Sequence, residues 1–325
     1  MLSDVREYYG LLRELQGMAQ HSTFDTAPLQ RIAKELKLAI KDGKLIALSG
    51  IVGTGKSTII ARLKDLLIQE KEILVAESLT ADGSQTTISS LITALFCDLS
   101  PEKDFKIPPP ERRERVLRDL IKKRHKPVAL LIDDAHSLNG NTLISLKRLT
   151  EVVRQGKGTL SIVLIGHPKL KNDLLRGAME EVGARTAIFE LEGFGPDKAQ
   201  YLEWLLHQAL GPKVKTETVL TDEAVALLRE RLATPLQFEI YLTRAFEEAF
   251  KVAQKPIGAD MIEAVLAKDL DELEARLMRQ GYTAKVVAEI LDIKPKEVRA
   301  FMKGHLPPER TQELHHGLLA AGVPL

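Results

Sequence analysis

One stretch of the sequence decides the fold: Gly50-Ile51-Val52-Gly53-Thr54-Gly55-Lys56-Ser57-Thr58. It matches G-x-x-x-x-G-K-[ST] at every fixed position. A short apolar run over 45–48 precedes it, and a helical pattern over 56–69 follows it. Glycines let the backbone wrap around an anion, so that successive N–H groups and the helix dipole point at phosphate oxygens. In this context a phosphate-binding loop is favoured over a glycine-rich turn that binds nothing.

Each residue of this loop, from Gly50 to Thr58, is therefore expected to lie against the nucleotide. Lys56 is expected to reach the β- and γ-phosphate oxygens and to act in catalysis. The hydroxyl of Ser57 is expected to bind Mg²⁺, which prefers oxygen ligands.

A second motif lies about 75 residues further along the chain, where the apolar run 128–132 ends in Asp133 and Asp134. A buried strand that ends in two carboxylates is typical of a Walker B motif. Asp133 is expected to hold Mg²⁺ together with Ser57, and Asp134 to polarise the attacking water. An acidic helix cap is the alternative, and the position of the pair after a phosphate loop disfavours it.

A third and weaker pattern is the apolar run 160–165, which ends in Gly166-His167-Pro168. His167, at the tip of this strand, is the candidate sensor that contacts the γ-phosphate or the water. A purely structural histidine is the alternative. His136, just after the aspartates, is interpreted as a capping or surface residue.

The rest of the chain divides by its pattern. Apolar runs at 45–48, 73–76, 128–132, 160–165 and 186–191 alternate with helical patterns, which predicts a parallel sheet with helices on both faces. From 196 onward all patterns are helical, over 196–210, 221–233, 235–254 and 258–278. We expect a helical segment at 1–42, an α/β core at 43–194, a helical lid at 195–278 and a helical domain at 279–325.

Composition sets limits on the function. Among 325 residues the formal net charge is +1 and the hydrophobic fraction is 44%, which is ordinary for a globular protein and excludes binding by bulk charge alone. No apolar run is long enough for a membrane span, so we expect no membrane partner and a cytoplasmic location. The one cysteine, Cys97, excludes a disulfide framework and is expected in the core.

Over residues 25–255 the chain resembles the AAA+ ATPases, through GIVGTGKST, LLIDDAH, LSIVLIGHP and the helical region that follows. Within them it is similar to the group of the ExeA-type ATPases and the transposition regulators TnsC, TniB and MuB. Phe24-Asp25-Thr26 and Gln30-Arg31-Ile32 carry that narrower resemblance. It implies the AAA+ fold, ATP and Mg²⁺ as cofactors, and ATP hydrolysis.

The resemblance also implies a homo-oligomer, a ring or a helical filament, in which a neighbour donates an arginine finger. Arg185, just before the last strand, fits that role best, and Arg176 is the second candidate. The chain departs from the family at two places. Asp134 stands where a glutamate is usual, which suggests slow hydrolysis, and Leu236 stands where a lid arginine is usual.

Two basic regions are candidates for double-stranded DNA. Residues 101–126 hold ten Lys or Arg and five Asp or Glu. By the resemblance to TnsC, Lys103, Lys106, Arg112 and Arg113 would track the DNA backbone; a solvated helix face is equally open. The residues 282–304 look like a helix-turn-helix whose Lys296 and Arg299 would contact DNA. A module that grips a transposase is equally open there.

The leading hypothesis is an ATP-dependent regulator of DNA transposition that oligomerises on target DNA and recruits a transposase. One alternative is an ExeA-type signalling or secretion ATPase without a role on DNA. The other is an ATPase that resembles replication initiators or loaders.

Overall fold

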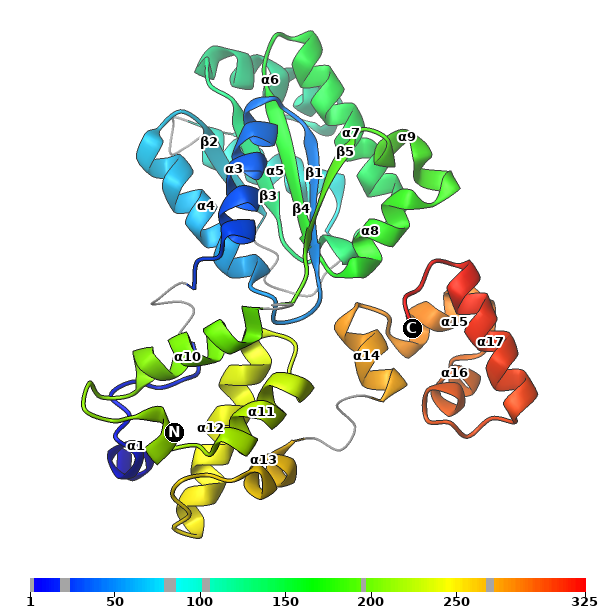
Figure 1. Cartoon of the computed structure of the whole chain (residues 1–325). Helices are drawn as coiled ribbons and strands as arrows, with labels where there is room; N and C mark the ends of the chain where they lie inside the picture. The colour runs from blue at the N-terminus through cyan, green and yellow to red at the C-terminus, as the bar shows by residue number, and fades with distance from the viewer. Residues whose placement is uncertain (1–2, 18–23, 79–85, 101–105, 194–196, 267–271) are drawn as a thin grey trace.

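The computed structural model describes residues 3–17, 24–78, 86–100, 106–193, 197–266 and 272–325. Its centre is a five-stranded, all-parallel sheet in the order β2-β3-β4-β1-β5 (Figure 1). The strands are β1 (Leu45–Gly50), β2 (Leu74–Ser78), β3 (Val128–Ile132), β4 (Leu160–Gly166) and β5 (Thr186–Leu191).

The three central strands β1, β3 and β4 are buried along their whole length, which explains their uninterrupted apolar sequences. Ser49 of β1 pairs with Gly166 of β4, and Gly50 pairs with Leu191 of β5. The carboxyl ends of the strands therefore meet at one edge, where ligands of open parallel sheets bind.

Helices cover both faces of the sheet, as the sequence predicts (Figure 1). Leu36 of α3 and Leu63 of α4 pack on one face, and Leu95 of α5 and Leu146 of α7 pack on the other. The core helices are α3 (Ala27–Lys41), α4 (Lys56–Glu70), α5 (Ile88–Leu99), α6 (Pro110–Arg124), α7 (Gly140–Gln155), α8 (Pro168–Leu175) and α9 (Glu180–Gly183), with short 3-10 turns η1 (Ala135–Ser137) and η2 (Gly177–Met179).

The lid is a separate helical layer at the carboxyl edge of the sheet (Figure 1). Its elements are α10 (Lys198–Ala209), η4 (Thr216–Thr218), α11 (Asp222–Arg231), α12 (Pro235–Lys251) and α13 (Ala259–Val265). The N-terminal α1 (Ser3–Tyr9) packs into this layer, because Val5 and Tyr9 are part of the lid core. The segment 1–42 thus contributes one helix to the lid and one, α3, to the sheet.

The last four helices form a small domain of their own. They are α14 (Leu273–Arg279), α15 (Ala284–Leu291), α16 (Pro295–Met302) and α17 (Pro308–Ala320). Of the predicted helix-turn-helix core, Val287, Ala288, Val298 and Phe301 are buried, and Leu291 and Ile293 pack against them. The single helix expected over 258–278 is wrong, because α13 ends at Val265 and α14 begins at Leu273.

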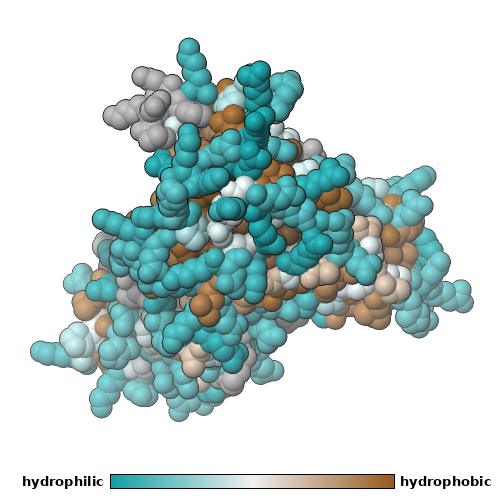
Figure 2. Space-filling view, turned by 90° about the horizontal axis from the view of Figure 1, so that it is seen from above, coloured by the Kyte–Doolittle hydropathy of each residue, from teal (hydrophilic) through white to brown (hydrophobic). Residues whose placement is uncertain are grey.

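Surface features complete the fold. The face seen in Figure 2 is mostly hydrophilic, with hydrophobic side chains in small separate areas. Cys97 is exposed on α5, which corrects its expected place in the core, because its neighbours Leu95, Phe96 and Leu99 fill the buried face of that helix. Among the described residues no helix combines the length and hydropathy that a membrane span requires.

Candidate nucleotide site

The phosphate loop follows β1 and leads into α4, as its sequence predicts. Gly50 has no room for a side chain, since a Cβ there would lie 2.8 Å from the carbonyl oxygen of Leu191 on β5. Gly53 has φ +84°, and its Cβ would lie 2.6 Å from Cβ of Leu236 in the lid. Gly55 has φ +90° at the N-cap of α4 and faces open space. Gly50 and Gly53 thus allow close packing against β5 and the lid, and Gly55 allows the left-handed turn into α4.

The side chain of Lys56 folds back onto the phosphate loop. Its Nζ donates hydrogen bonds to the carbonyl oxygens of Gly50, at 2.7 Å, and Ile51, at 3.0 Å. Burial lowers the pKa of Lys56, against the opposing effect of Asp133 and Asp134. The lysine is therefore folded onto its own loop, with carbonyl oxygens in the place where phosphate oxygens would be its partners. Ser57 is exposed beside it.

The two aspartates lie where β3 ends. Both side chains are exposed, and the carboxylate of Asp133 accepts a hydrogen bond from the N–H of Asp134 at 2.9 Å. Asp134 has φ +49° and begins the turn η1. This left-handed residue turns the chain back over the strand tips, so that two carboxylates are presented near Lys56. Ser57 and Asp133 offer the oxygen ligands that Mg²⁺ prefers.

His136 and His167 form a pair beside these carboxylates. Their ring centroids lie 4.1 Å apart, and the Nδ1 atoms of both rings are buried without a hydrogen-bond partner. Ligand atoms of Asp134, His136 and His167 lie within 4.8 Å of one another. His136 is therefore part of the site, and its interpretation as a capping or surface residue is wrong. Because two imidazoles suit Mg²⁺ poorly, this group fits a water or a phosphate oxygen better.

The electrostatics of the pair follow from burial. Burial, His136 and Lys56 together lower the pKa of His167 to about 4, and burial also lowers the pKa of His136. Both rings are neutral at pH 7. A neutral imidazole donates from one nitrogen and accepts at the other, so His167 can orient a water without adding charge.

A small pocket borders the phosphate loop and is the candidate site for the base. Phe24, Trp204 and Pro235 line it together with Thr54 and Thr58. The ring centroids of Phe24 and Trp204 are 5.6 Å apart. Sequence reasoning missed the role of Trp204, although it is the single tryptophan of the chain. Because Trp204 lies on α10 of the lid, both the lid and the core line this pocket.

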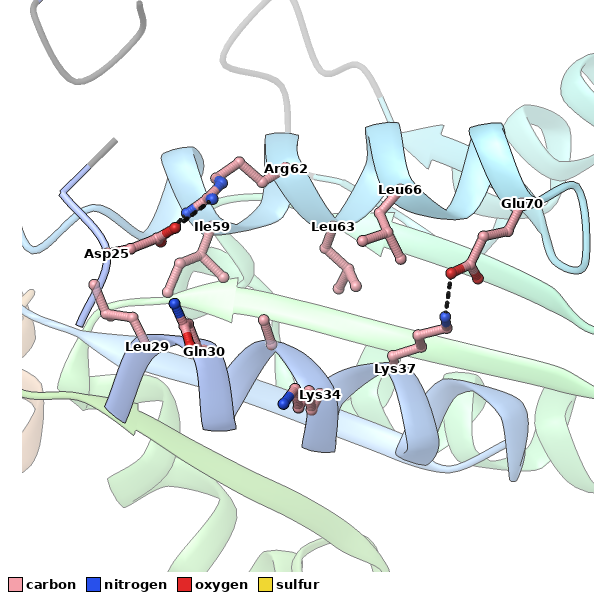
Figure 3. Close-up of a pocket in the computed structure, with 11 residues that line it drawn as sticks. Asp25, Leu29, Gln30, Lys34, Lys37, Ile59, Arg62, Leu63, Leu66 and Glu70 are labelled. Carbon is pink, nitrogen blue, oxygen red and sulfur yellow. Dashed lines mark hydrogen bonds and ion pairs between the residues drawn. The ribbon is translucent and has the colours of Figure 1, made fainter. Parts of the chain in front are cut away.

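Next to this pocket lies a larger cavity of about 400 Å³ between α3 and α4 (Figure 3). Leu29, Ile59 and Arg62 line both hollows, so the two are neighbours. The ion pair between Arg62 and Asp25 stands between helix α4 and the segment before α3 (Figure 3). Hydrogen bonding to Arg62 lowers the pKa of Asp25. This pair fixes the chain that carries Phe24.

The lid contacts the loop at the place where an arginine is usual. The N–H of Leu236 lies 3.4 Å from the carbonyl oxygen of Gly53. Gln237 caps α12, since its Oε1 accepts hydrogen bonds from the N–H groups of Ala233 and Thr234. Arg244 stacks on Tyr241 at 5.5 Å. Neither side chain replaces the absent lid arginine.

The two finger candidates lie away from the chain's own phosphate loop. Arg185 directly precedes β5, at the amino end of the sheet, and it is ion-paired with Glu151 and 61% exposed. Arg176 caps the end of α8 and lies 3.4 Å from Asp173. Because the strands are parallel, Arg185 lies at the opposite edge of the sheet from Gly50, away from the phosphate loop of its own chain.

The candidate DNA contacts differ in their surroundings. Lys103 lies outside the described residues. Lys106 and Arg112 are exposed, whereas Arg113 donates hydrogen bonds to the carbonyl oxygen of Pro108 and to Ser89 Oγ. Lys296 and Arg299 are exposed on α16. Arg113 is therefore the least available of the group.

Part of the chain, including the phosphate loop and the two aspartates, is similar to known proteins. Residues 39–175 match the AAA domain family. The general secretion pathway protein A of Aeromonas hydrophila is 30% identical over 168 residues, which are 48% of this chain and 28% of that protein. The chain thus spans less than a third of the length of this curated relative.

Solved structures with a similar fold come from origin recognition proteins. The ORC2 protein of Aeropyrum pernix, solved as complexes with ADPNP and ADP, aligns with a TM-score of 0.58 at 12% identity over 96% of this chain and 91% of that one. The ORC1 protein of Aeropyrum pernix in complex with DNA gives 0.53 at 16% identity over 96% and 88%. Drosophila ORC bound to DNA gives 0.51 at 18% identity over 95% and 84%.

The fold is that of the AAA+ ATPases, with the helical C-terminal region included in the alignment. Residues 39–175 form an AAA domain with its phosphate loop and carboxylates in place. The match of residues 39–175 to the AAA domain family indicates an ATPase that uses ATP and Mg²⁺.

Proposed function

We propose that the chain is an ATP-controlled DNA-binding protein that assembles on duplex DNA. The observation that carries this proposal is the surface of α16. Lys296, Arg299 and Lys303 are exposed and follow one another at spacings of three and four residues, so they share one face of the helix. Such a face suits contact with DNA phosphates.

Two further observations support DNA as the partner. The helix α15 turns into α16 through Asp292, which has φ +52°, and the two helices share one core. That arrangement is the one expected of a helix-turn-helix. The structures of ORC1 from Aeropyrum pernix and of Drosophila ORC are complexes with DNA, and both share the fold over nearly the whole chain.

The finer proposal is a regulator of transposition, in which the assembly on DNA recruits a transposase. It rests on the sequence resemblance to TnsC, TniB and MuB, together with a finger candidate, Arg185, that can act only across a subunit interface. A ring or filament is the form of oligomer that supplies such an interface.

A secretion or signalling role is the second candidate, favoured by the 30% identity with general secretion pathway protein A. Electron microscopy with and without ATP and duplex DNA separates the two. Ordered assemblies that need both ATP and DNA support the proposal. Assemblies that form with ATP alone, and that ignore DNA, favour the secretion role.

A second measurement tests the recruitment of a transposase. The gene that neighbours the gene for this chain should encode an RNase-H-like integrase, and its product should bind the ATP-loaded assembly. An integrase that binds equally well without ATP contradicts ATP-controlled recruitment, while DNA binding as such would stand.

A further inference from the structure

The chain between α14 and α15 lies on the phosphate site. The N–H of Val52, in the phosphate loop, donates a hydrogen bond to the carbonyl oxygen of Arg279 at 3.1 Å. The N–H of Lys169, in the first turn of α8, donates to the carbonyl oxygen of Gln280 at 3.2 Å. Two backbone N–H groups that follow β1 and β4 are thus hydrogen-bonded to the C-terminal domain.

Gly281, the next residue, packs directly on the candidate sensor. It has φ +91°, and a Cβ at this position would lie 2.9 Å from Cβ of His167. Only glycine combines this backbone conformation with so close an approach. The contact therefore depends on the absence of a side chain at residue 281.

A side chain of the ATPase core also holds the C-terminal domain. Asn172 of α8 donates hydrogen bonds to the hydroxyl of Tyr282, at 2.6 Å, and to the carbonyl oxygen of Gly322, at 2.8 Å. Tyr282 is fully buried in the core of the C-terminal domain. Segment 279–282 is therefore part of the C-terminal domain, and the two can detach from the ATPase core only as one unit.

This segment covers the groups that are expected to face the terminal phosphate. Val52 and His167 both border it, one from the phosphate loop and one from the strand tip beside Asp134. Lys56 points at carbonyl oxygens of its own loop. A phosphate that draws Lys56 outward and contacts His167 needs the volume that Arg279, Gln280 and Gly281 now fill.

We propose that segment 279–282 is a plug that competes with the γ-phosphate, so that ATP, but not ADP, releases the C-terminal domain from the ATPase core. ADP ends at the β-phosphate, which lies deeper in the loop and is compatible with the docked plug. This device goes beyond the proposed function, because it acts within one chain and without DNA.

Release has a consequence for assembly. Arg176, Leu175 and Glu289 line the cleft between α8 and the C-terminal domain. Undocking opens this face of α8, with the second finger candidate, to a second copy of the chain. Because the γ-phosphate and segment 279–282 compete for one place, ATP binding exposes this face of α8. By linkage, a second copy that binds the exposed face should in turn favour ATP binding.

The test uses energy transfer between two dyes on the full chain. Cys97 is exposed on the core, and Glu309→Cys places a second exposed thiol on α17. Transfer efficiency is measured without nucleotide, with ADP, and with a non-hydrolysable ATP analogue in Mg²⁺. The account predicts the same transfer efficiency without nucleotide and with ADP, and a clearly different efficiency with the analogue.

Three variants sharpen the test. Gly281→Ala should shift the transfer efficiency in all states toward the value that the parent chain has with the analogue, and should raise affinity for the ATP analogue over that for ADP. Gly304→Ala is the matched control, since Gly304 has φ +68° in the same domain but a Cβ there meets nothing within 4 Å; it should behave like the parent chain. Asn172→Ala weakens the docking from the core side and should shift release to lower analogue concentration.

The proposal fails if the analogue binds and the transfer efficiency does not change, or if Gly281→Ala and Gly304→Ala respond alike. It also fails if ADP releases the domain as fully as the ATP analogue does. Each reading is taken without DNA, so a failure here and a failure of DNA binding are told apart.

Discussion

The imidazole rings of His136 and His167 face each other with centroids 4.1 Å apart, although they follow different strands, β3 and β4. Asp134 completes the group, with its carboxylate 4.0 Å from Nδ1 of His136. This arrangement places two neutral imidazole rings and a carboxylate near Lys56. A water held there would lie between the carboxylate and the terminal phosphate, where a hydrolytic ATPase needs it.

The low pKa of His167 is directly measurable. Burial holds it at about 4, against 6.5 for a free histidine. An NMR titration should show one histidine of the folded chain that stays neutral down to pH 5, and this resonance should be missing in His167→Asn. A midpoint near 6.5 for all histidines would contradict the buried placement.

The same shift has a consequence for stability. As the pH falls below 6.5 the unfolded chain binds a proton at this histidine first, which lowers the free energy of unfolding until the folded form titrates near pH 4. The parent chain should therefore lose more stability than His167→Asn between pH 6.5 and 4, as measured by urea unfolding. If the parent chain and His167→Asn lose the same stability, His167 does not contribute to the pH dependence in this range.

Lys56→Ala should abolish stable ATP binding. The lysine is the cation of the phosphate loop, and removal of one partner of a desolvated charge pair costs about 2–5 kcal/mol, which is roughly 30-fold or more in affinity. Titration calorimetry with ATP and Mg²⁺ measures it. Unchanged affinity would overturn the assignment of the site.

Asp134→Asn should leave ATP binding intact and lower turnover by about 100-fold or more. The carboxylate orients the water but contributes little to the affinity of the ground state. Asp133→Asn is the informative comparison, because it should instead raise the Mg²⁺ concentration that hydrolysis requires. If turnover survives in Asp134→Asn, another group activates the water.

Arg185→Ala should lower hydrolysis by about 10³-fold without emptying the nucleotide site, as expected of an arginine finger. A mixture of Arg185→Ala and Lys56→Ala chains should recover part of the activity, since one supplies an intact nucleotide site and the other an intact finger. Arg176→Ala, examined in the same mixture, decides between the two candidates. No recovery in either mixture would contradict a finger in trans.

Much of the site is predictable from local sequence. The glycines of the phosphate loop, the aspartates after β3 and the histidine after β4 each sit directly after an apolar strand, and parallel strands bring their carboxyl ends together. The five strands and the helical lid are confirmed for the same reason, because each is encoded in a continuous periodic stretch.

What the sequence leaves out depends on contacts between distant segments. Helix α8 is short and begins at Pro168, directly after the strand, so its eight residues give little periodicity. His136 enters the site only because Asp134 turns the chain back. The docking of Gly281 on His167 joins residues more than a hundred positions apart, and no local pattern records it.

The basic face of α16 is expected to contribute to DNA affinity and to its salt dependence. Lys296→Ala with Arg299→Ala should weaken binding to all DNA sequences alike and flatten the salt slope by roughly one to two, since each phosphate contact contributes about 0.9. Lys103→Ala with Lys106→Ala tests the other basic region in the same way. Lys213→Ala with Lys251→Ala, exposed lysines of the lid, is the matched control and should change neither quantity.

The central claim, that ATP controls DNA binding, is tested most directly by DNA affinity measured over a salt series with ATP, with ADP and without nucleotide. ATP should favour assembly, which multiplies weak phosphate contacts, so affinity and salt slope should both be largest with ATP. DNA should in return tighten ATP binding, because linkage is reciprocal. The same affinity in all three states would contradict the account and favour an ATPase that works without DNA.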